Sequence, residues 1–379
     1  MKDKIKILYF MDGIGNGGGI QEMAVKWMHN ITRSKVQIDI LSYNRINNDN
    51  FIQRIEELGG HVYIVQTFIS LKYFLKSFTD LNRFFKKHND YDILHAHSSS
   101  KAIFVMFYAK IYGIKTRILH SHCASFIMKG KFSLLAAYLC KPITKMLSTD
   151  YFACSIEAGR FLFGSKAIEN NKVKIIHNAV NTDIYEYNPI VREKVRKELG
   201  IESKIVIGNI GRLSLQKNHS FLLKIFKSVV EMDDNAMLLL VGIGELEDSI
   251  KMLACKLGIN DKVIFLGYRN DAYNIMQAMD ILVMPSFYEG LPVTGVEAQA
   301  EGLPCVFSNF ITREALILEK GDFISLDEPT NIWAYKILDM VKNYKRYNVK
   351  EIIKKKGYDI IIETKKLEDI YFEKIKLNE

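Results

Sequence analysis

Two glutamates bracket a turn rich in Gly and Pro in the second half of the chain, within Glu289-Gly-Leu-Pro-Val-Thr-Gly-Val-Glu297. The turn follows the apolar run 281–284, which is typical of a buried parallel strand, and leads into a helix-forming stretch at 296–300. A strand, a turn and a helix start in this order place backbone N–H groups at the carboxyl edge of a sheet, where α/β proteins bind anions. Carboxylates beside such a site suit a ligand that carries both phosphates and hydroxyl groups, such as a sugar nucleotide. The alternative is that Glu289 lies on a solvated loop and Glu297 on an exposed helix face.

A pair of cations lies earlier, where the turn Gly211-Arg212-Leu-Ser-Leu-Gln-Lys217 follows another strand-like run, 205–210. Arg offers a planar fork of donors to phosphate oxygens, and Lys offers a point charge. Their separation across a turn lets Arg212 and Lys217 converge on a diphosphate. The alternative is two solvated cations on a basic protein. The next strand-to-helix turn, Gly242-Ile-Gly244, is a weak signal by itself.

A glycine cluster, Gly13-Ile-Gly15-Asn-Gly17-Gly18-Gly19, directly follows the first strand-like run. It contains the Gly-x-Gly-x-x-Gly fingerprint of dinucleotide binding, which also requires an acidic residue at the end of the second strand. Asp39 has the right separation but lies inside the strand, so a ribose clamp is poorly supported. We expect these glycines to let the backbone approach a phosphate or sugar closely, with a purely structural turn as the alternative.

Two histidine pairs end successive strands, His95 with His97 and His120 with His122. The two-residue period of a strand puts both members of a pair on one side. A metal site is the alternative, but no carboxylate or cysteine completes it at a recognisable spacing. We therefore expect one histidine, His120, to face a ligand cleft, and the others to be satisfied polar residues.

Strand-like and helix-like segments alternate along the chain and position these residues. The predicted strands are 5–10, 36–43, 62–65, 93–97, 117–120, 151–155 and 173–177, and then 205–210, 237–241, 263–266, 281–284 and 305–307. Predicted helices between them include 21–30, 51–58, 71–87, 102–112 and 132–147. This alternation predicts an α/β protein with two doubly wound, Rossmann-like domains that face each other across a cleft. The polar stretch 183–188, which ends at Pro189, is the best candidate for the linker.

Composition narrows the class of protein. The 379 residues include no run of 18 apolar residues, so we expect no transmembrane span, and the first residues lack the apolar core of a signal peptide. Five cysteines, scattered singly, indicate reduced thiols in a cytoplasmic protein. The net charge of +9 favours an anionic partner. Since no nucleic-acid recognition motif is present, we do not expect that partner to be nucleic acid.

Taken together, these motifs resemble the retaining glycosyltransferases of the GT-B fold, in the large family four that includes capsular and exopolysaccharide enzymes. The double-glutamate segment 289–297 is the most specific element. The supporting segments are Gly211-Arg212 with Gln216-Lys217-Asn218, Phe265-Leu-Gly-Tyr268-Arg269, Cys154-Ser155 with Ala158-Gly159, and Ile176-His-Asn178-Ala-Val-Asn181. The last departs from the commoner Asn-Gly-Val-Asp, and we interpret that turn as structural.

The resemblance assigns roles in the second domain. Glu297 is expected to bind the nucleotide ribose, and Glu289 the hydroxyl groups of the donor sugar. Arg212 and Lys217 are expected to neutralise the diphosphate leaving group in place of a metal. The backbone that is expected to hold the distal phosphate and the sugar belongs to Gly290, Leu291, Pro292, Val293 and Thr294.

Further roles follow for the rest of the chain. Backbone near Arg269 is expected to meet the base, and His120 to lie near the donor sugar. The amino-terminal loop that approaches the phosphates or the acceptor corresponds to Gly17, Gly18 and Gly19. The expected domains are an acceptor-side domain at 1–185, a nucleotide-sugar domain at 186–355, and a carboxy-terminal helix at 356–379 that packs back on the first domain.

The implied reaction is transfer of a sugar from a nucleoside diphosphate sugar, with UDP the nucleotide that the resemblance favours, and with no metal or other cofactor. The configuration at the anomeric carbon is retained, and the acceptor is a glycan or a polyprenyl-diphosphate-linked sugar. Segments 71–87 and 128–145 mix lysines with large apolar residues and suit either an anionic membrane surface or an ordinary core.

Three other functions remain open on the sequence. The first is another enzyme of similar fold, a sugar-nucleotide epimerase or a phosphorylase. The second is an NAD-dependent oxidoreductase, which rests on the first glycine cluster. The third is a basic nucleic-acid-binding protein, which rests on charge alone.

Overall fold

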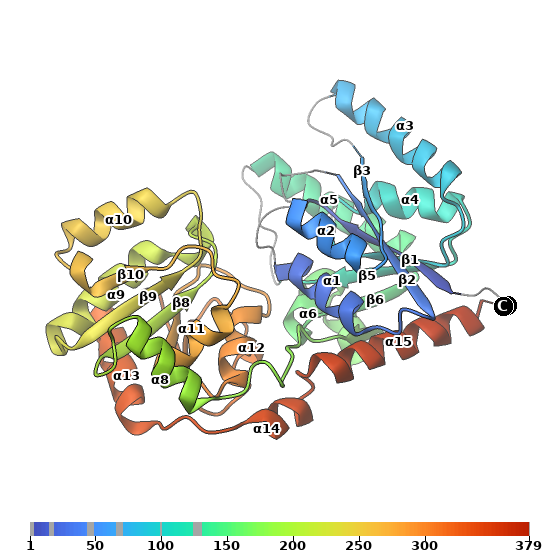
Figure 1. The fold of residues 1–379 in the computed structure, drawn as a ribbon. Helices are drawn as coiled ribbons and strands as arrows, with labels where there is room; N and C mark the ends of the chain where they lie inside the picture. Colours follow the sequence, from blue (N-terminus) through green and yellow to red (C-terminus); the bar gives the residue numbers. More distant parts are fainter. Residues whose placement is uncertain are drawn as a thin grey trace. The chain divides into compact units, whose positions relative to one another are not determined.

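The chain divides into two compact units, each built round one parallel sheet (Figure 1). The structure, a computed structural model, describes residues 4–14, 19–43, 49–65, 71–98, 101–123 and 131–378. The first unit holds Met1–His177 and Ile360–Glu379, and the second holds Asn178–Asp359.

These boundaries differ from the expected divisions after residues 185 and 355. The amide of Val180 donates to the carbonyl of Tyr358 at 3.0 Å, and the Thr182 hydroxyl donates to Asp359 at 2.5 Å. The carbonyl of Glu186 accepts from a side chain of the same unit, Gln277. The connecting segments on both sides are therefore bound into the second unit.

Within the described residues, the first unit contains a seven-stranded sheet in the order β3-β2-β1-β4-β5-β6-β7. Its strands are β1 Ile5–Met11, β2 Val36–Ser42, β3 Val62–Ile64, β4 Ile93–Ala96, β5 Thr116–Ser121, β6 Asp150–Ala153 and β7 Val173–Ile175. Its helices are α1 Gly19–Asn30, α2 Asp49–Glu57, α3 Leu71–Lys87, α4 Ile103–Ile111, α5 Lys131–Leu147, α6 Ile156–Phe163, α7 Ser165–Glu169 and α15 Ile360–Lys376. The strand order reverses between β1 and β4, where doubly wound sheets bind ligands at their carboxyl edge.

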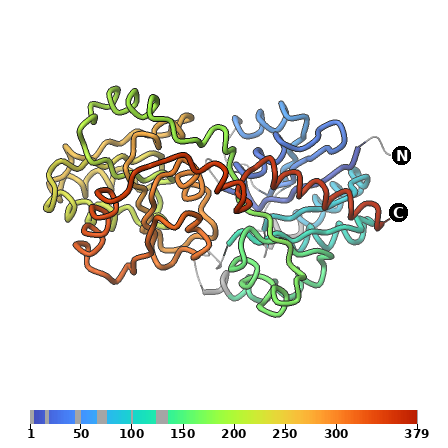
Figure 2. The backbone as a smooth tube through the Cα atoms, turned by 90° about the horizontal axis from the view of Figure 1, so that it is seen from below, coloured from blue at the N-terminus to red at the C-terminus, as the bar shows by residue number. Residues whose placement is uncertain are grey.

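The last helix, α15, belongs to the first unit and packs against α1. Figure 2 shows it, in red, running along that unit. Tyr371 on α15 and Tyr9 on β1 join their hydroxyls at 2.9 Å, and Glu368 accepts from the amide of Thr32 at 3.0 Å. The end of the chain thus contributes side chains to the interior of the first unit.

The second unit, as far as it is described, contains a six-stranded sheet in the order β10-β9-β8-β11-β12-β13. Its strands are β8 Ile205–Ile210, β9 Ala236–Val241, β10 Val263–Phe265, β11 Ile281–Met284, β12 Cys305–Ser308 and β13 Gly321–Ile324. Its α-helices are α8 Pro189–Glu198, α9 His219–Met232, α10 Glu247–Lys256, α11 Ala272–Ala278, α12 Val293–Ala300, α13 Thr330–Asn343 and α14 Lys350–Lys355, and its 3₁₀ turns are η1 Leu215–Lys217, η2 Asn260–Lys262 and η3 Arg313–Ala315.

Burial explains why the central strands are apolar throughout. All four residues of β11 are buried, as are those of β4 and β12, because helices cover both faces of a parallel sheet. The sequence analysis missed β13, since Gly and Asp, which open it, are depleted in strands. Among the described residues, no helix combines the length and the apolar character that crossing a bilayer requires.

Candidate active site

The loop after β11 and the turn after β8 meet through an ion pair. The ammonium Nζ of Lys217 lies 2.7 Å from Oε1 of Glu289, and the two side chains are only 16% and 10% exposed. The sequence analysis assigned Lys217 to a diphosphate and Glu289 to a sugar. The structure brings both side chains to one place, where each neutralises the other.

Hydrogen bonds between the two loops hold this ion pair in place. The amide of Phe287 donates to the carbonyl of Gln216 at 2.9 Å, and the Gln216 side chain donates to the carbonyl of Tyr288 at 3.0 Å. The Asn218 side chain donates to the carbonyl of Pro285 at 3.1 Å. Asn218 has a φ of 56°, a left-handed conformation that Asn tolerates better than most residues. The residues on either side of Lys217 are therefore fixed to the Glu289 loop.

Close approach of backbone explains the glycines in the neighbouring turn. A Cβ on Gly242 would lie 2.0 Å from the carbonyl oxygen of Gly211, and one on Gly244 would lie 2.3 Å from that of Leu213. The amide of Leu213 donates to the carbonyl of Ile243 at 3.0 Å. The turn that was a weak signal by itself is thus the platform on which the Arg212 loop rests.

Arg212 and Arg269 lie on exposed loops and are each paired with a carboxylate that the sequence analysis did not single out. Arg212 lies 3.1 Å from Glu245, and these side chains are 62% and 53% exposed. Arg269 lies 2.6 Å from Asp271. Exposed ion pairs contribute little to stability, so an incoming phosphate can replace either carboxylate at low cost.

The short helix α12 carries the second glutamate of the motif. Leu291 and Pro292 before it are buried, whereas Glu297 on the helix is half-buried. Gly290, Val293 and Thr294 are also half-buried. The helix start lies just beyond the carboxyl end of β11, the position at which backbone N–H groups favour an anion.

A buried glutamine, which the sequence analysis missed, fixes α12. The Gln299 side chain donates to the carbonyls of Gly295 and Ala315 at 2.9 and 2.6 Å. Its oxygen accepts from the amides of Ile317 and Leu318 at 2.7 and 2.9 Å. Four hydrogen bonds from one side chain therefore tie the helix to the segment after β12, and only its place two residues after Glu297 pointed to it.

The histidine pairs of the first unit form one buried cluster. His95 and His120 approach at 3.0 Å between Nε2 and Nδ1, and His97 and His122 at 2.9 Å between Nδ1 and Nε2. Trp27 stacks on His97 and His120 with ring centroids 5.5 and 5.8 Å apart. Burial lowers the pKa of all four imidazoles, that of His122 to about 3, so they are neutral near pH 7.

This cluster corrects part of the expectation. His97 and His122 were expected to be satisfied polar residues, yet each has one ring nitrogen without a hydrogen-bond partner in the described part of the chain. His120 is 1% exposed, and its Nε2 likewise has no partner there. Three buried imidazole nitrogens thus remain available in this region.

A metal is poorly suited to the cluster, although His95, His97 and His120 bring ligand atoms within 4.8 Å of one another. The rings of His95 and His120 are within 12° of parallel, and those of His95 and His97 within 28°. The lone pairs of stacked rings lie in nearly parallel planes and do not converge as tetrahedral zinc requires. Both nitrogens of His95 also already have partners.

Other sequence-based assignments fall elsewhere. Gly17 and Gly18 lie outside the described residues, and Gly19 begins α1. Asp39, the weak candidate for a ribose clamp, is buried and accepts hydrogen bonds from the Tyr91 hydroxyl at 2.7 Å and the His61 amide at 2.8 Å. Its carboxylate is therefore engaged within the unit.

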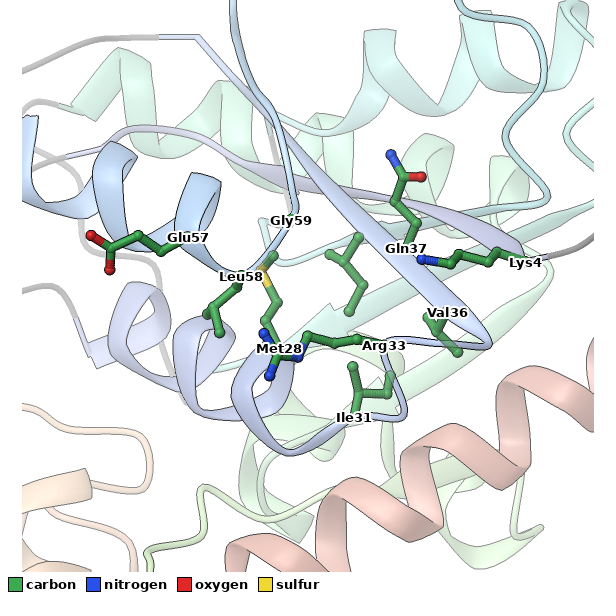
Figure 3. Close-up of a pocket in the computed structure, with 10 residues that line it drawn as sticks. Lys4, Met28, Ile31, Arg33, Val36, Gln37, Glu57, Leu58 and Gly59 are labelled. Carbon is green, nitrogen blue, oxygen red and sulfur yellow. The ribbon is translucent and has the colours of Figure 1, made fainter.

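A hollow of 240 Å³ also lies in the first unit (Figure 3). It is lined by Lys4 and Val36, where β1 and β2 begin, and by Met28, Glu57 and Gly59 near the ends of α1 and α2. This is the amino edge of the sheet, opposite the edge at which doubly wound sheets bind ligands. We assign it no part in the active site.

Comparison with known proteins identifies the family. Residues 17–184 match the family described as Glycosyltransferase Family 4, and residues 191–349 match Glycosyl transferases group 1. EpsF of Bacillus subtilis (strain 168), which is named as a glycosyltransferase, is 32% identical over 362 residues, a match that covers 93% of each chain. The chain belongs to the family 4 glycosyltransferases.

Two further comparisons extend over most of this glycosyltransferase. An Escherichia coli protein named UDP-Gal:alpha-D-GlcNAc-diphosphoundecaprenol alpha-1,3-galactosyltransferase is 28% identical over 319 residues, 81% of each chain. The crystal structure of Anabaena HepE in complex with UDP superposes with a TM-score of 0.78 at 18% identity, over 97% of this chain and 100% of that chain. The latter shows the fold, two Rossmann-like units of the GT-B type.

Proposed function

We propose that this glycosyltransferase moves a sugar from a UDP-sugar to a glycan or a polyprenyl-diphosphate-linked acceptor in surface polysaccharide biosynthesis. The reaction retains the anomeric configuration and uses no metal. The observation that carries this proposal is the Lys217–Glu289 ion pair, which two bonded loops hold beside the start of α12. A cation, a carboxylate and helix-start N–H groups together suit a diphosphate that is attached to a sugar.

The proposed step breaks the bond between the anomeric carbon and the diphosphate oxygen and forms a bond to the acceptor oxygen. Negative charge develops on the departing phosphate, where Lys217 and Arg212 stabilise it electrostatically. The acceptor hydroxyl attacks from the face that the leaving group departs, and its proton passes to a phosphate oxygen. Glu289 accepts hydrogen bonds from donor-sugar hydroxyls, and Glu297 from the ribose. The step needs no protein nucleophile.

The ion pairs of the second unit support this assignment of charges. Lys217 has three N–H donors, so it can keep Glu289 and contact a phosphate oxygen at the same time. Arg212 exchanges the exposed carboxylate of Glu245 for phosphate. Two cations in these positions do the work that a divalent metal does in other transferases, which is why we propose metal independence.

The choice of nucleotide and acceptor has support from the two further comparisons. The name of the E. coli relative specifies UDP-Gal and a diphosphoundecaprenol-linked sugar, and the HepE crystal contains UDP. The same name specifies an alpha-1,3 product. Since the sugar of UDP-galactose is α-linked, an α product is what retention gives.

A panel of ligands tests the proposed function. Ligands that bind only the folded state raise the thermal midpoint, so we expect UDP and at least one UDP-sugar to raise it, with EDTA present or absent. An effect that EDTA abolishes would contradict metal independence. A shift with NADH alone would favour an oxidoreductase, and conversion of the donor to an isomer without acceptor would favour an epimerase.

We also propose that α5 rests on an anionic membrane surface, where a lipid-linked acceptor resides. Its exposed residues are apolar over three turns: Leu135, Tyr138, Leu139, Ile143 and Met146. The lysines of this helix do not point outward as the sequence suggested. Lys141 donates to the carbonyl of Phe161, and Lys145 donates to that of Phe163 at 2.8 Å. The apolar face meets the acyl region, and the net charge of +9 supplies the attraction to anionic lipid.

Vesicle flotation tests this surface. We expect binding to phosphatidylglycerol vesicles but not to phosphatidylcholine vesicles, and loss of binding in Leu139→Glu/Met146→Glu. The matched control is Ile190→Glu, since Ile190 is an exposed apolar residue of α8 in the second unit. Equal flotation of the double variant and the wild type would exclude α5 as the docking face.

A further inference from the structure

A chain of hydrogen bonds leads from the carboxy-terminal helix to His120. The Tyr9 hydroxyl lies 2.9 Å from that of Tyr371, which lies 2.6 Å from Nδ1 of His95. Nε2 of His95 lies 3.0 Å from Nδ1 of His120. All four side chains are fully or almost fully buried. Water therefore does not compete for these groups, and each proton in the chain has a defined place.

The short distance at His95 sets the direction of the chain. A separation of 2.6 Å is typical of a hydroxyl donor and is shorter than the usual range for an N–H donor. Tyr371 therefore donates to Nδ1 of His95 and accepts from Tyr9. Because burial keeps His95 neutral, its single ring proton is on Nε2, from which it donates to Nδ1 of His120. His120, also neutral, then carries its proton on Nε2.

The opposite direction is less favourable. If His120 donated to His95, His95 would donate to Tyr371 and Tyr371 to Tyr9. The Tyr9 hydroxyl proton would then have no acceptor among the described residues, in a side chain that is 0% exposed. A buried donor without an acceptor carries a desolvation penalty. The first direction leaves its one unpaired proton at Nε2 of His120 instead.

We propose that Tyr371 and His95 are positioning residues that hold His120 in the Nε2–H tautomer, so that His120 donates a hydrogen bond to a donor-sugar oxygen. This inference rests on the proposed function for the identity of the ligand. It gives α15 a part in the active site, because this helix brings Tyr371 to the end of β4. Nε2 of His120, buried and without a partner in the described residues, is the group that the ligand satisfies.

Nitrogen NMR of protein labelled with ¹⁵N-histidine tests the tautomer directly and without any activity measurement. His120 is assigned among the nine histidines by comparison with His120→Gln. We expect Nε2–H for His120 in the unliganded wild type. In Tyr371→Phe, His95 loses the donor at Nδ1, so both tautomers become similar in energy and a mixture is expected. In Tyr9→Phe, Tyr371 still donates to His95, and the wild-type tautomer is expected to remain. Nδ1–H on His120 in the wild type would overturn the proposal.

Donor kinetics then connect the tautomer to function. We expect kcat/KM for the UDP-sugar to fall about threefold to tenfold in Tyr371→Phe, the range of one neutral hydrogen bond. The control is Tyr344→Phe, because Tyr344 has a buried hydroxyl without a hydrogen-bond partner in the described second unit. An unchanged tautomer with unchanged kinetics in Tyr371→Phe would refute the proposal. If the wild type bound no sugar nucleotide, the proposed function would fail, while the spectrum of unliganded protein would still decide the tautomer. If Tyr371→Phe failed to fold, the wild-type spectrum would decide alone.

Discussion

Near the carboxyl edge of the second sheet, Lys217 and Glu289 carry opposite charges on loops that the structure leaves partly open. Near the corresponding edge of the first sheet, His95 and His120 are neutral, stacked and buried. The charged pair meets a ligand by sharing or exchanging a counter-ion. The neutral cluster meets it with one donor whose proton is placed in advance. The difference indicates that the second unit stabilises developing charge and the first unit orients an uncharged part of the ligand.

Replacing Glu289 by Gln should have the largest effect on this comparison. The substitution keeps the shape but removes the carboxylate that accepts from sugar hydroxyls and pairs with Lys217. We expect UDP release from the UDP-sugar to slow by about 10- to 100-fold, the range of a charged hydrogen bond. A coupled assay for UDP measures this. Turnover at the wild-type rate would show that Glu289 serves only as a counter-ion.

Lowering the pH should distinguish the neutral cluster by its effect on stability. The folded-state pKa of each buried histidine is below the unfolded value of about 6.5. Below that pH the unfolded chain binds protons that the folded chain does not. The free energy of unfolding therefore falls between pH 6.5 and the folded-state pKa, which is about 3 for His122.

The loss should amount to about 2 kcal/mol per buried histidine at pH 5. His219 in the second unit, whose pKa burial lowers to about 4, acts in the same direction. A matched comparison removes such background. Urea unfolding at pH 7.5 and pH 5 should show a loss that is about 2 kcal/mol smaller in His122→Gln than in the wild type. Equal losses would mean that His122 is protonated in the folded protein.

The exposed pair of Arg212 and Glu245 allows a smaller change in each direction. Removing Arg212 as Ala should weaken UDP binding about threefold to fivefold, since an exposed cation is screened by water. Removing the competitor as Glu245→Gln should strengthen it by about twofold. Calorimetric titration at low salt measures both. If both variants weakened binding, Glu245 would be a ligand-binding residue and not a competitor.

Arg269→Ala should have the smallest effect. Only the backbone near this residue is expected to meet the base, and its side chain is paired with Asp271 on an exposed loop. We expect UDP affinity within about twofold of the wild type. A larger loss would assign the guanidinium itself to the nucleotide.

The sequence predicted the elements well and the side-chain partners poorly. The prediction of a helix over 71–87 matches α3 in both bounds, because the apolar period and length were clear. The pairing of Lys217 with Glu289 was not predicted, since it depends on how the loops after β8 and β11 approach each other. The two-residue period placed His95 with His97, but contact with His120 depends on the register of β4 against β5.

Other parts of the site had almost no signal in the sequence. Tyr371 reaches His95 because α15 returns to the first unit, and the spacing along the chain gives no measure of that contact. Gln299 resembles any helix residue until its four hydrogen bonds are known. Such contacts come from tertiary packing, which pattern and propensity do not encode.

The central claim is that Lys217 receives the donor diphosphate while Glu289 receives the sugar. Calorimetric titration of UDP into the wild type, Lys217→Met and Glu289→Gln tests it most directly. We expect Lys217→Met to bind UDP at least about tenfold more weakly, and Glu289→Gln to bind UDP within about threefold of the wild type but to lose the added affinity of the UDP-sugar. Unliganded thermal midpoints confirm that each variant is folded. Wild-type affinity for UDP in folded Lys217→Met would contradict the account.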